Sequence, residues 1–306
     1  MKINTVIPKP IKAYDLHNHS IVSKDGGTPE KQIIDLAAER GLKGIGICDH
    51  DEFPDESLYN YAEQKGIKLA LGIEFSCKKA HIIGYNMNIT DDRDRTQLEK
   101  YFNLMKSSYV EAAKKMIRAF RADCIDISHE EIQRAYNKKH VQKLFIFKYL
   151  AEKMDLGFES WGEVRQWLKR QSNPDFYVVD GKNVIELDPV EVIHLIHRAG
   201  GYAIWAHPFM THPLEVREKY FDLFIQAGID AVEADYAYQE NGYSGKESNE
   251  ALDSIIRKRL TEANVPVSGG SDSHFPHKTY ADKTPIQPGD FGITEEEFQL
   301  IQHMFK

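Results

Sequence analysis

The first 90 residues alternate short apolar runs with amphipathic segments. Four runs, AYDLHNH, KGIGICDH, IKLALGIEFS and HIIGYNM, predict strands. Between the first two runs, Ile33, Leu36, Ala37 and Leu42 recur near helical spacing, and Gly41 marks the end of that segment. Strands separated by helices are typical of parallel βα units, so this part of the chain predicts an α/β fold.

The pattern changes after residue 90. The following 80 or so residues carry dense Lys, Glu, Gln and Arg and are nearly free of β-rich runs. This composition, with apolar residues at helical spacing, predicts three or four helices. We expect them near residues 95–121, 128–137, 141–154 and 159–170.

From residue 188 the alternation of strands and helices resumes and continues to the end of the sequence. We therefore predict one α/β domain formed by residues 1–90 and 188–306, with a helical insertion at 91–187 that caps the substrate site. Without the insertion about 206 residues and six or seven strands remain, which is short for an eight-stranded barrel of typically ~250 residues. The count favours a seven-stranded barrel or an open doubly wound sheet.

Histidines and carboxylates gather where the predicted strands end. In parallel α/β folds the carboxyl ends of the strands meet at one rim, so these side chains would converge. Two histidines in a His-x-His strand also face the same side, as a metal site requires. The candidate ligands are His17, His19, Asp25, His50, Glu74, His81, His207, Asp272 and His274.

Imidazole nitrogen combined with carboxylate oxygen suits Mn²⁺, Zn²⁺ or Fe²⁺. One metal takes three or four protein ligands, so nine candidates predict two or three divalent ions. Among them, we expect Glu74, Asp272 and His207 to take part in catalysis.

Composition narrows the possible functions. The net charge of −8 disfavours binding of duplex DNA through phosphate neutralisation, although a local cation allows a small anionic substrate. No apolar run approaches ~18 residues, so we expect no membrane span. The N-terminal segment lacks the apolar stretch of a secretion signal. Three cysteines without CxxC spacing fit a reducing cytoplasm.

Five motifs follow one another along the chain: Asp15-x-His17-x-His19, Asp49-His50-Asp51, Gly72-x-Glu74-x-Ser76, Ala206-His207-Pro208 and Gly270-Ser271-Asp272-x-His274. Together they resemble the PHP (polymerase and histidinol phosphatase) family of metal-dependent phosphoesterases. The insertion and the segment HIIGY resemble those of the family branch that contains nucleoside 3′,5′-bisphosphate phosphatases and a short-RNA exonuclease. The resemblance implies a distorted seven-stranded (β/α) barrel.

The resemblance also implies three metal ions. Their ligands would be His17, His19, Glu74 and Asp272 for the first, a bridging Glu74 with His81 and His207 for the second, and Asp25, His50 and His274 for the third. Two segments depart from the family pattern. The loop Ser23-Lys24-Asp25-Gly26 is one residue longer than the usual Ser-Asp-Gly, and Lys143-Leu144-Phe145 stands where the branch has an Arg-Pro-His-like stretch.

The reaction that we expect is hydrolysis of a phosphomonoester of a small metabolite. We expect this metabolite to be a nucleotide, such as a nucleoside 3′,5′-bisphosphate. A hydroxide held between two metals would attack phosphorus in line. Asp15, Asp49 and Asp51 are expected to orient the histidine rings. The predicted substrate contacts are Lys143, His140, Ser76 and Glu233.

Three alternatives remain open at this point. A histidinol-phosphate phosphatase would share the motifs, although that branch is not built around such an insertion. An amidohydrolase also begins with His-x-His but carries its bridging residue on the fourth strand, whereas Glu74 ends the third. The last alternative is a metal-binding module without catalysis, against which the intact ligand set argues. The native metal, the exact substrate and the oligomeric state stay open as well.

Overall fold

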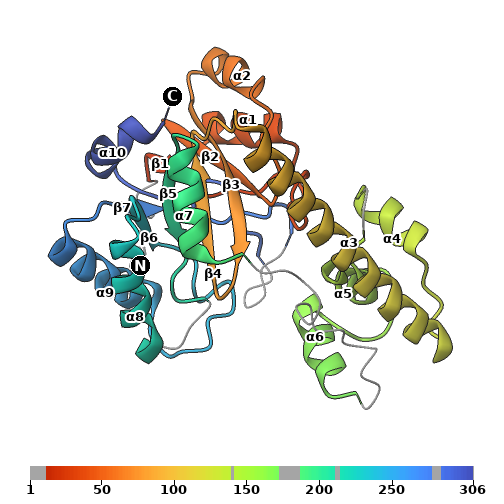
Figure 1. Ribbon diagram of the computed structural model, residues 1–306. Helices are drawn as coiled ribbons and strands as arrows, with labels where there is room; N and C mark the ends of the chain where they lie inside the picture. The colour runs from red at the N-terminus through yellow and green to blue at the C-terminus, as the bar shows by residue number, and fades with distance from the viewer. Residues whose placement is uncertain (1–11, 139–140, 172–186, 211–213, 278–283, 306) are drawn as a thin grey trace, which may run out of the picture.

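A computed structural model describes residues 12–138, 141–171, 187–210, 214–277 and 284–305 of the chain (Figure 1). In these residues seven strands form one sheet in which neighbours follow the chain order. The strands are β1 (Tyr14–Asp15), β2 (Gly44–His50), β3 (Lys68–Cys77), β4 (Ala80–Tyr85), β5 (Tyr202–Ala206), β6 (Ala231–Asp235) and β7 (Val267–Gly269).

Helices surround this sheet and also form a group at one side of it (Figure 1). Those next to the strands are α1 (Glu30–Glu39), α2 (Leu58–Gln64), α7 (Pro189–Arg198), α8 (Leu214–Gln226), α9 (Asn249–Ala263) and α10 (Glu295–Ile301), which the short 3₁₀ helix η1 (Gln302–Met304) follows. The remaining helices are α3 (Asp92–Ala122), α4 (His129–Tyr136), α5 (Lys143–Glu152) and α6 (Trp161–Lys169).

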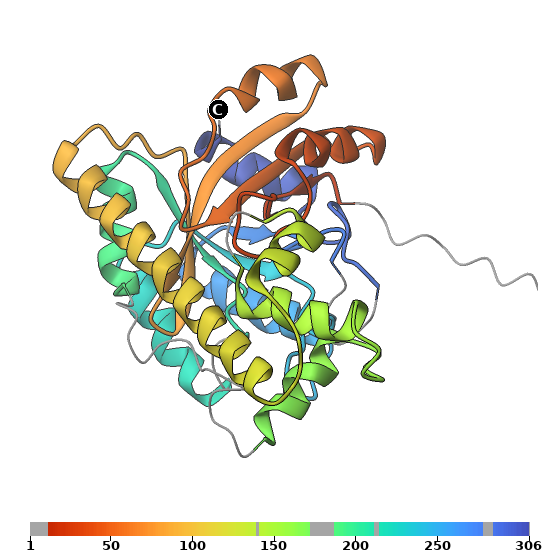
Figure 2. The ribbon, with the colours of Figure 1, turned by 90° about the vertical axis from the view of Figure 1, so that its right-hand side faces the viewer.

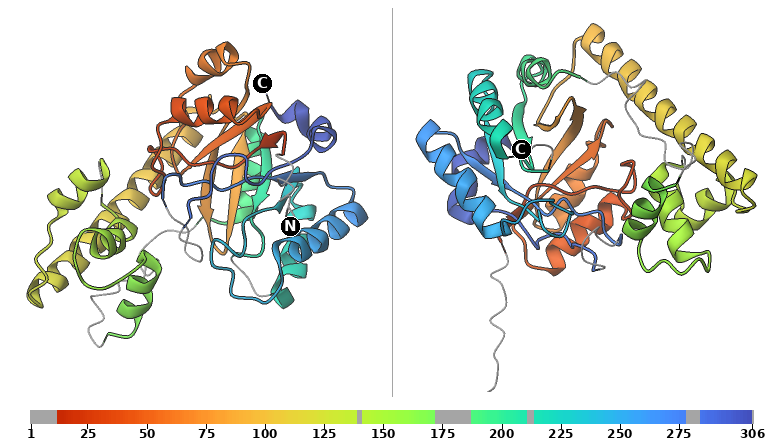
Figure 3. Two further views of the ribbon diagram at one scale, coloured as in Figure 1. Left: turned by 180° about the vertical axis from the view of Figure 1, so that it is seen from behind. Right: turned by 90° about the horizontal axis from the view of Figure 1, so that it is seen from below.

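The sheet curves until its first and last strands approach each other (Figure 3). The N–H of Leu16 donates to the carbonyl of Gly269 at 3.1 Å, and Asn18 forms a parallel bridge with Ser273. The result is a nearly closed barrel, which confirms the predicted seven-stranded (β/α) architecture. We call the end where the parallel strands have their carboxyl termini the rim.

Strand β4 runs against the direction of its neighbours, a feature that the sequence pattern did not predict. It pairs antiparallel with both β3 and β5, whereas the other neighbouring strands pair in parallel. A two-residue turn at Lys78 and Lys79 joins β3 to β4, which is too short for the crossover that a parallel strand needs. The amino end of β4 therefore lies at the rim.

A buried tyrosine ties β4 to the first strand inside the barrel. Tyr85 is fully buried, and its hydroxyl donates to the carbonyl of Leu16 at 2.5 Å. Gly72 on β3 leaves the space for this ring, since a Cβ there would lie 2.6 Å from Tyr85 Cδ1. This bond holds the strand of His81 against the segment that leads to His17.

The four helices α3–α6 coincide with the four predicted for the insertion. Figure 2 shows them in front of the barrel, with α3 running along it. The first half of α3 packs Leu98 and Phe102 into the core beside β3 and α7, and its second half packs Met116 and Phe120 against α4–α6. Among the described helices none, α3 included, combines the length and the apolar character of a membrane span.

This packing predicts how α3 contributes to stability. Phe120 is fully buried, so Phe120→Ala should lower the free energy of unfolding by about 3–5 kcal/mol. Leu104→Ala on the same helix removes a 40% exposed side chain and should change it by less than about 0.5 kcal/mol. Urea denaturation followed by circular dichroism measures both, and equal effects of the two substitutions would contradict the packing described.

Candidate metal centre

The structure brings the nine predicted ligands together at the rim. Most of them lie in or just after the carboxyl ends of parallel strands. His81 reaches the same place from the amino end of β4, because the antiparallel register sets it opposite Ser76 on β3 and Ala206 on β5. The position of a ligand in the sequence therefore does not determine which other ligands it lies near. The directions of the strands do.

Four donor atoms form a compact group at the floor of the rim. They are His17 Nε2, His19 Nε2, Glu74 Oε2 and Asp272 Oδ1, and the imidazole–carboxylate distances among them run from 3.0 to 3.4 Å. Ligands placed 2.0–2.2 Å from one ion in a tetrahedron lie about 3.3–3.6 Å apart. The two carboxylate oxygens are buried and have no hydrogen-bond partner among the described residues. This donor set therefore fits a divalent cation.

Glu74 is shared by the rings around it. Five imidazoles of the described residues lie within 3.4 Å of its carboxylate oxygens, with His81 Nδ1 at 2.9 Å and His207 Nε2 at 3.0 Å from Oε1. Burial alone would raise the pKa of Glu74, but His50, His81 and His17 hold that pKa well below its ordinary value. The carboxylate is thus ionised and able to bridge two cations.

A further group of donor atoms lies at the part of the rim next to the loop that follows β1. Ligand atoms of His19, Asp25, His50 and His274 all lie within 4.8 Å of one another. His50 has its Nδ1 3.2 Å from Glu74 Oε2 and its Nε2 3.6 Å from Asp25 Oδ2. Its two nitrogens therefore face different donor groups, and Asp25 joins the cluster despite the longer loop.

Glu233 has a different place from the one predicted. We expected it to contact substrate, but its side chain is buried and both oxygens lie 3.2–3.3 Å from His17 Nδ1. It also accepts the N–H of His207 at 2.8 Å. Because its oxygens are engaged inside the barrel, Glu233 fixes the ring of His17 instead of meeting a ligand.

Tyr236 has a similar role that sequence reasoning missed. Its hydroxyl donates to Asp272 Oδ2 at 2.7 Å and accepts from Asn241 Nδ2 at 2.9 Å. This bond leaves Asp272 Oδ1 directed at the first donor group. In the sequence, the one feature that could have indicated this role is the position of Tyr236 directly after β6.

The three aspartates expected to orient histidine rings bind other groups. Asp15 accepts from the N–H groups of His17, Ser271 and Gly289. Asp49 accepts from the N–H and the hydroxyl of Ser20, and Asp51 accepts from the N–H of Ser76. The loops that follow the strands contain backbone N–H groups without a partner in the sheet. These carboxylates accept hydrogen bonds from them. Burial raises the pKa of Asp15 to about 6, although its hydrogen bonds oppose the shift. The prediction for these residues was wrong in its detail.

The backbone at the rim is strained at two candidate ligands. His207 has φ 30° and Asp272 has φ 47°, in the left-handed region that non-glycine residues rarely adopt. Next to Asp272, Gly270 permits a close backbone approach, since a Cβ there would lie 2.4 Å from His17 Cβ. Such strain persists where surrounding contacts impose it, and it is typical of functional sites.

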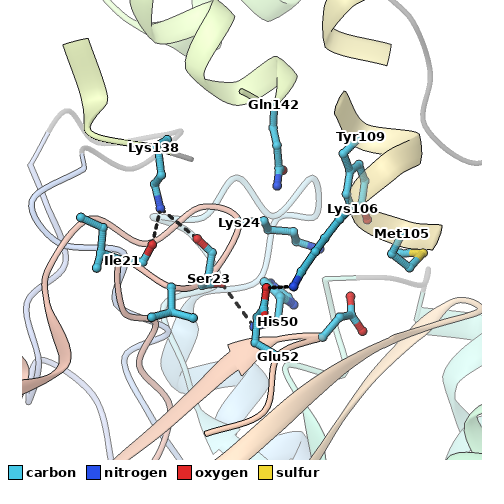
Figure 4. Close-up of a pocket in the computed structure, with 12 residues that line it drawn as sticks. Ile21, Ser23, Lys24, His50, Glu52, Met105, Lys106, Tyr109, Lys138 and Gln142 are labelled. Carbon is cyan, nitrogen blue, oxygen red and sulfur yellow. Dashed lines mark hydrogen bonds and ion pairs between the residues drawn. The ribbon is translucent and has the colours of Figure 1, made fainter. Parts of the chain in front are cut away.

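A cavity of about 320 Å³ opens beside the cluster, between the barrel and the segment from α3 to α5 (Figure 4). His50 lines it from the barrel, Tyr109 from α3, and Gln142 from just before α5. Of the predicted substrate contacts, Ser76 accepts a hydrogen bond from the cavity residue Lys24 at 3.2 Å. Lys143 is not among the residues that line the cavity, and His140 lies outside the described residues.

The contacts of Glu233 and Tyr236 predict their effect on metal affinity. Glu233→Gln and Tyr236→Phe should each raise the Kd for Mn²⁺ roughly 10–100-fold, the usual cost of losing a group that orients a ligand. Tyr61→Phe is the control, because it removes a hydroxyl that bonds Asp35 on a helix away from the rim. Isothermal titration calorimetry on metal-depleted protein measures the three constants. An unchanged Kd for Glu233→Gln and Tyr236→Phe would contradict the roles assigned.

Comparisons with known proteins agree with this geometry. Residues 15–186 match the PHP domain. The chain is 26% identical over 284 residues to the 5′-3′ exoribonuclease of Haemophilus influenzae, which covers 87% of this chain and 91% of that protein. Together, the family match and the donor cluster support a metal-dependent hydrolase.

Two solved structures share the fold. One, from Bifidobacterium adolescentis, carries the provisional description of a metal-dependent phosphoesterase and has a TM-score of 0.71 at 18% identity, covering 97% of this chain and 98% of that one. The other is an amidohydrolase from Chromobacterium violaceum with bound sulfate and no metal, with a TM-score of 0.67 at 19% identity over 95% and 96% of the two chains. The match to the PHP domain extends over more than half of the sequence, and the chain belongs to the PHP domain family.

Proposed function

We propose that this protein is a metal-dependent phosphoesterase that hydrolyses a phosphate ester of a nucleotide. The observation that carries the proposal is the environment of Glu74, an ionised buried carboxylate among five imidazoles of the described residues. Its Oε2 and Asp272 Oδ1 have no hydrogen-bond partner in the described part of the chain. Buried charges of this kind are stabilised by pairing or by a metal.

The proposed ligands follow the donor groups. One ion would be held by His17, His19, Glu74 and Asp272, a second by Glu74, His81 and His207, and a third by Asp25, His50 and His274. When bound, divalent cations would polarise the phosphoryl oxygens and ease deprotonation of the attacking water. Water adds to phosphorus as the bond to the ester oxygen breaks, and the ester oxygen leaves as an alcohol after taking a proton. The phosphoryl group is released as inorganic phosphate from a monoester or as a monoester from a diester.

The side chains of this protein contribute orientation to that reaction. Glu233 fixes the ring of His17, and Tyr236 directs one oxygen of Asp272. Catalysis would depend directly on Glu74, Asp272 and His207, which lie at the centre of the cluster. The insertion would act as a cap, because Tyr109 of α3 and Gln142 complete a cavity that begins at His50.

Two nucleotide substrates suit this site. The first is a nucleoside 3′,5′-bisphosphate, in which a phosphomonoester is cleaved. The second is a short RNA cleaved at a phosphodiester, a candidate supported by the similarity to the exoribonuclease of Haemophilus influenzae. Both reactions need the same cations and the same attack on phosphorus, and they differ in the leaving group.

A reducing compartment such as the cytoplasm is part of the proposal. Cys48, Cys77 and Cys124 are all free, and the first two are buried. Burial also raises the pKa of the Cys77 thiol well above its ordinary value, which keeps it protonated.

The proposal predicts metal-dependent turnover. Protein reconstituted with Mn²⁺ should release inorganic phosphate from adenosine 3′,5′-bisphosphate or mononucleotides from a 5′-phosphorylated RNA trimer, and a chelator should abolish either release. Glu74→Gln should lower turnover by more than about 100-fold, beyond the loss of an orienting contact. Glu63→Gln on α2, an exposed position, is the matched control and should leave turnover unchanged.

Chromatography of the products distinguishes the two substrates. Free phosphate from the bisphosphate alone would favour a phosphatase, and mononucleotides from the trimer would favour an exonuclease. Absence of both products from metal-loaded protein, or full activity of Glu74→Gln, would contradict the proposed function.

A further inference from the structure

The cavity lies beside the donor cluster and not over it. Of the nine candidate ligands, only His50 lines its wall. A ligand group in the cavity would therefore be next to the metal-bound end of a substrate. The remaining wall combines the apolar side chains of Ile21 and Met105, the ring of Tyr109 and lysine ammonium groups. Apolar walls with a few placed charges are typical of small-molecule sites.

Three lysines line the cavity, and they differ in their partners. Lys106 Nζ pairs with Glu52 Oε1 at 2.5 Å. Lys138 Nζ donates to two carbonyl oxygens of the loop after β1, each at 2.9 Å. Lys24 Nζ donates to the hydroxyl of Ser76 at 3.2 Å and lies 5.2 Å from the ring centre of Tyr109.

Lys24 has carboxylates in its surroundings but forms no close ion pair with them. Burial opposes its charge, yet Tyr109, Asp25 and Asp51 raise the pKa of its ammonium group. Among the described residues no ion pair within 4.0 Å joins its Nζ to a carboxylate, and the hydroxyl of Ser76 accepts a hydrogen bond from it. An ammonium group has three donors, so it can bind a ligand oxygen in addition to Ser76. Figure 4 shows the side chains of Lys24, Lys106 and Gln142 reaching into the same space from three segments.

The loop that carries Lys24 fixes its direction. Ser23 Oγ donates to Asp25 Oδ1 at 2.9 Å and accepts the N–H of His50 at 3.3 Å, so the side chains on both sides of Lys24 are bound within the cluster. Lys24 and Ser23 both line the cavity. Lys138 donates to the carbonyl of Ser23, which anchors the backbone from which Lys24 extends.

We propose that Lys24 is a specificity residue that binds a second phosphate group of the substrate in this cavity, next to the phosphate that is hydrolysed. The inference rests on the proposed function and adds the requirement for two phosphate groups. A lysine binds phosphate as a point charge, while Tyr109 and Met105 offer apolar contact to the nucleoside. The second phosphate is either a monoester, as in a bisphosphate, or the diester of a short oligonucleotide.

The test compares Lys24→Met with wild type on three substrates: adenosine 3′,5′-bisphosphate, the 5′-phosphorylated dinucleotide pApA and adenosine 5′-monophosphate. For the substrates with two phosphates, kcat/KM should fall roughly 10–100-fold, mainly through KM, as expected for a lost hydrogen bond to a charged group. For the monophosphate it should change less than about threefold. Whichever of the two larger substrates is affected identifies the source of the second phosphate.

Two further variants separate binding from folding. Lys24→Arg keeps the charge and should retain most of the discrimination between one and two phosphates. Lys100→Met removes an exposed lysine from α3, outside the cavity lining, and should behave as wild type. Equal losses on all three substrates, or no loss on any, would overturn the proposal for Lys24.

The same proteins distinguish failure of this inference from failure of the proposed function. Wild type that hydrolyses none of the substrates contradicts the function itself. Calorimetric titration of the Mn²⁺-loaded proteins with adenosine 3′,5′-bisphosphate then tests Lys24 alone. Binding at least 10-fold tighter in wild type than in Lys24→Met supports the inference, and equal or absent binding overturns it.

Discussion

The burial of one ionised carboxylate, Glu74, is the constraint on which the rim depends. A charge in a protein interior is costly unless opposite charge or hydrogen bonds surround it. Here the sheet supplies the compensation, since β3 sets Glu74 opposite His50 on β2 and beside the antiparallel β4 that begins near His81. The direction of β4 is therefore part of the site, because a parallel strand would carry its first residues to the other end of the barrel.

Other features at the rim follow from holding these donors in place. His207 and Asp272 adopt left-handed backbone angles, and Glu233 and Tyr236 use buried hydrogen bonds to orient ligand side chains. None of these arrangements stabilises the fold by apolar burial. They are tolerated because the barrel core and the bond from Tyr85 to Leu16 fix the strands beneath them.

Much of the site could be predicted from the sequence, because polar residues at strand ends must converge in a parallel barrel. The periodicity of apolar residues gave six or seven strands and three or four inserted helices, against seven strands and the helices α3–α6 in the described residues. It could not give the direction of β4, since periodicity is the same in either direction. Sequence reasoning also assigned Asp15, Asp49 and Asp51 to histidine rings, whereas each carboxylate accepts a hydrogen bond from a backbone N–H group. Lys24 was missed because its role depends on which way a loop side chain points.

The most direct test of the central claim is anomalous diffraction from crystals of the protein grown with Mn²⁺. We expect a peak bounded by His17 Nε2, His19 Nε2, Glu74 Oε2 and Asp272 Oδ1, at about 2.0–2.3 Å from each, as for ordinary metal–ligand bonds. Manganese bound elsewhere, with no peak among these four atoms, would contradict the claim that Glu74 is buried in order to hold a cation.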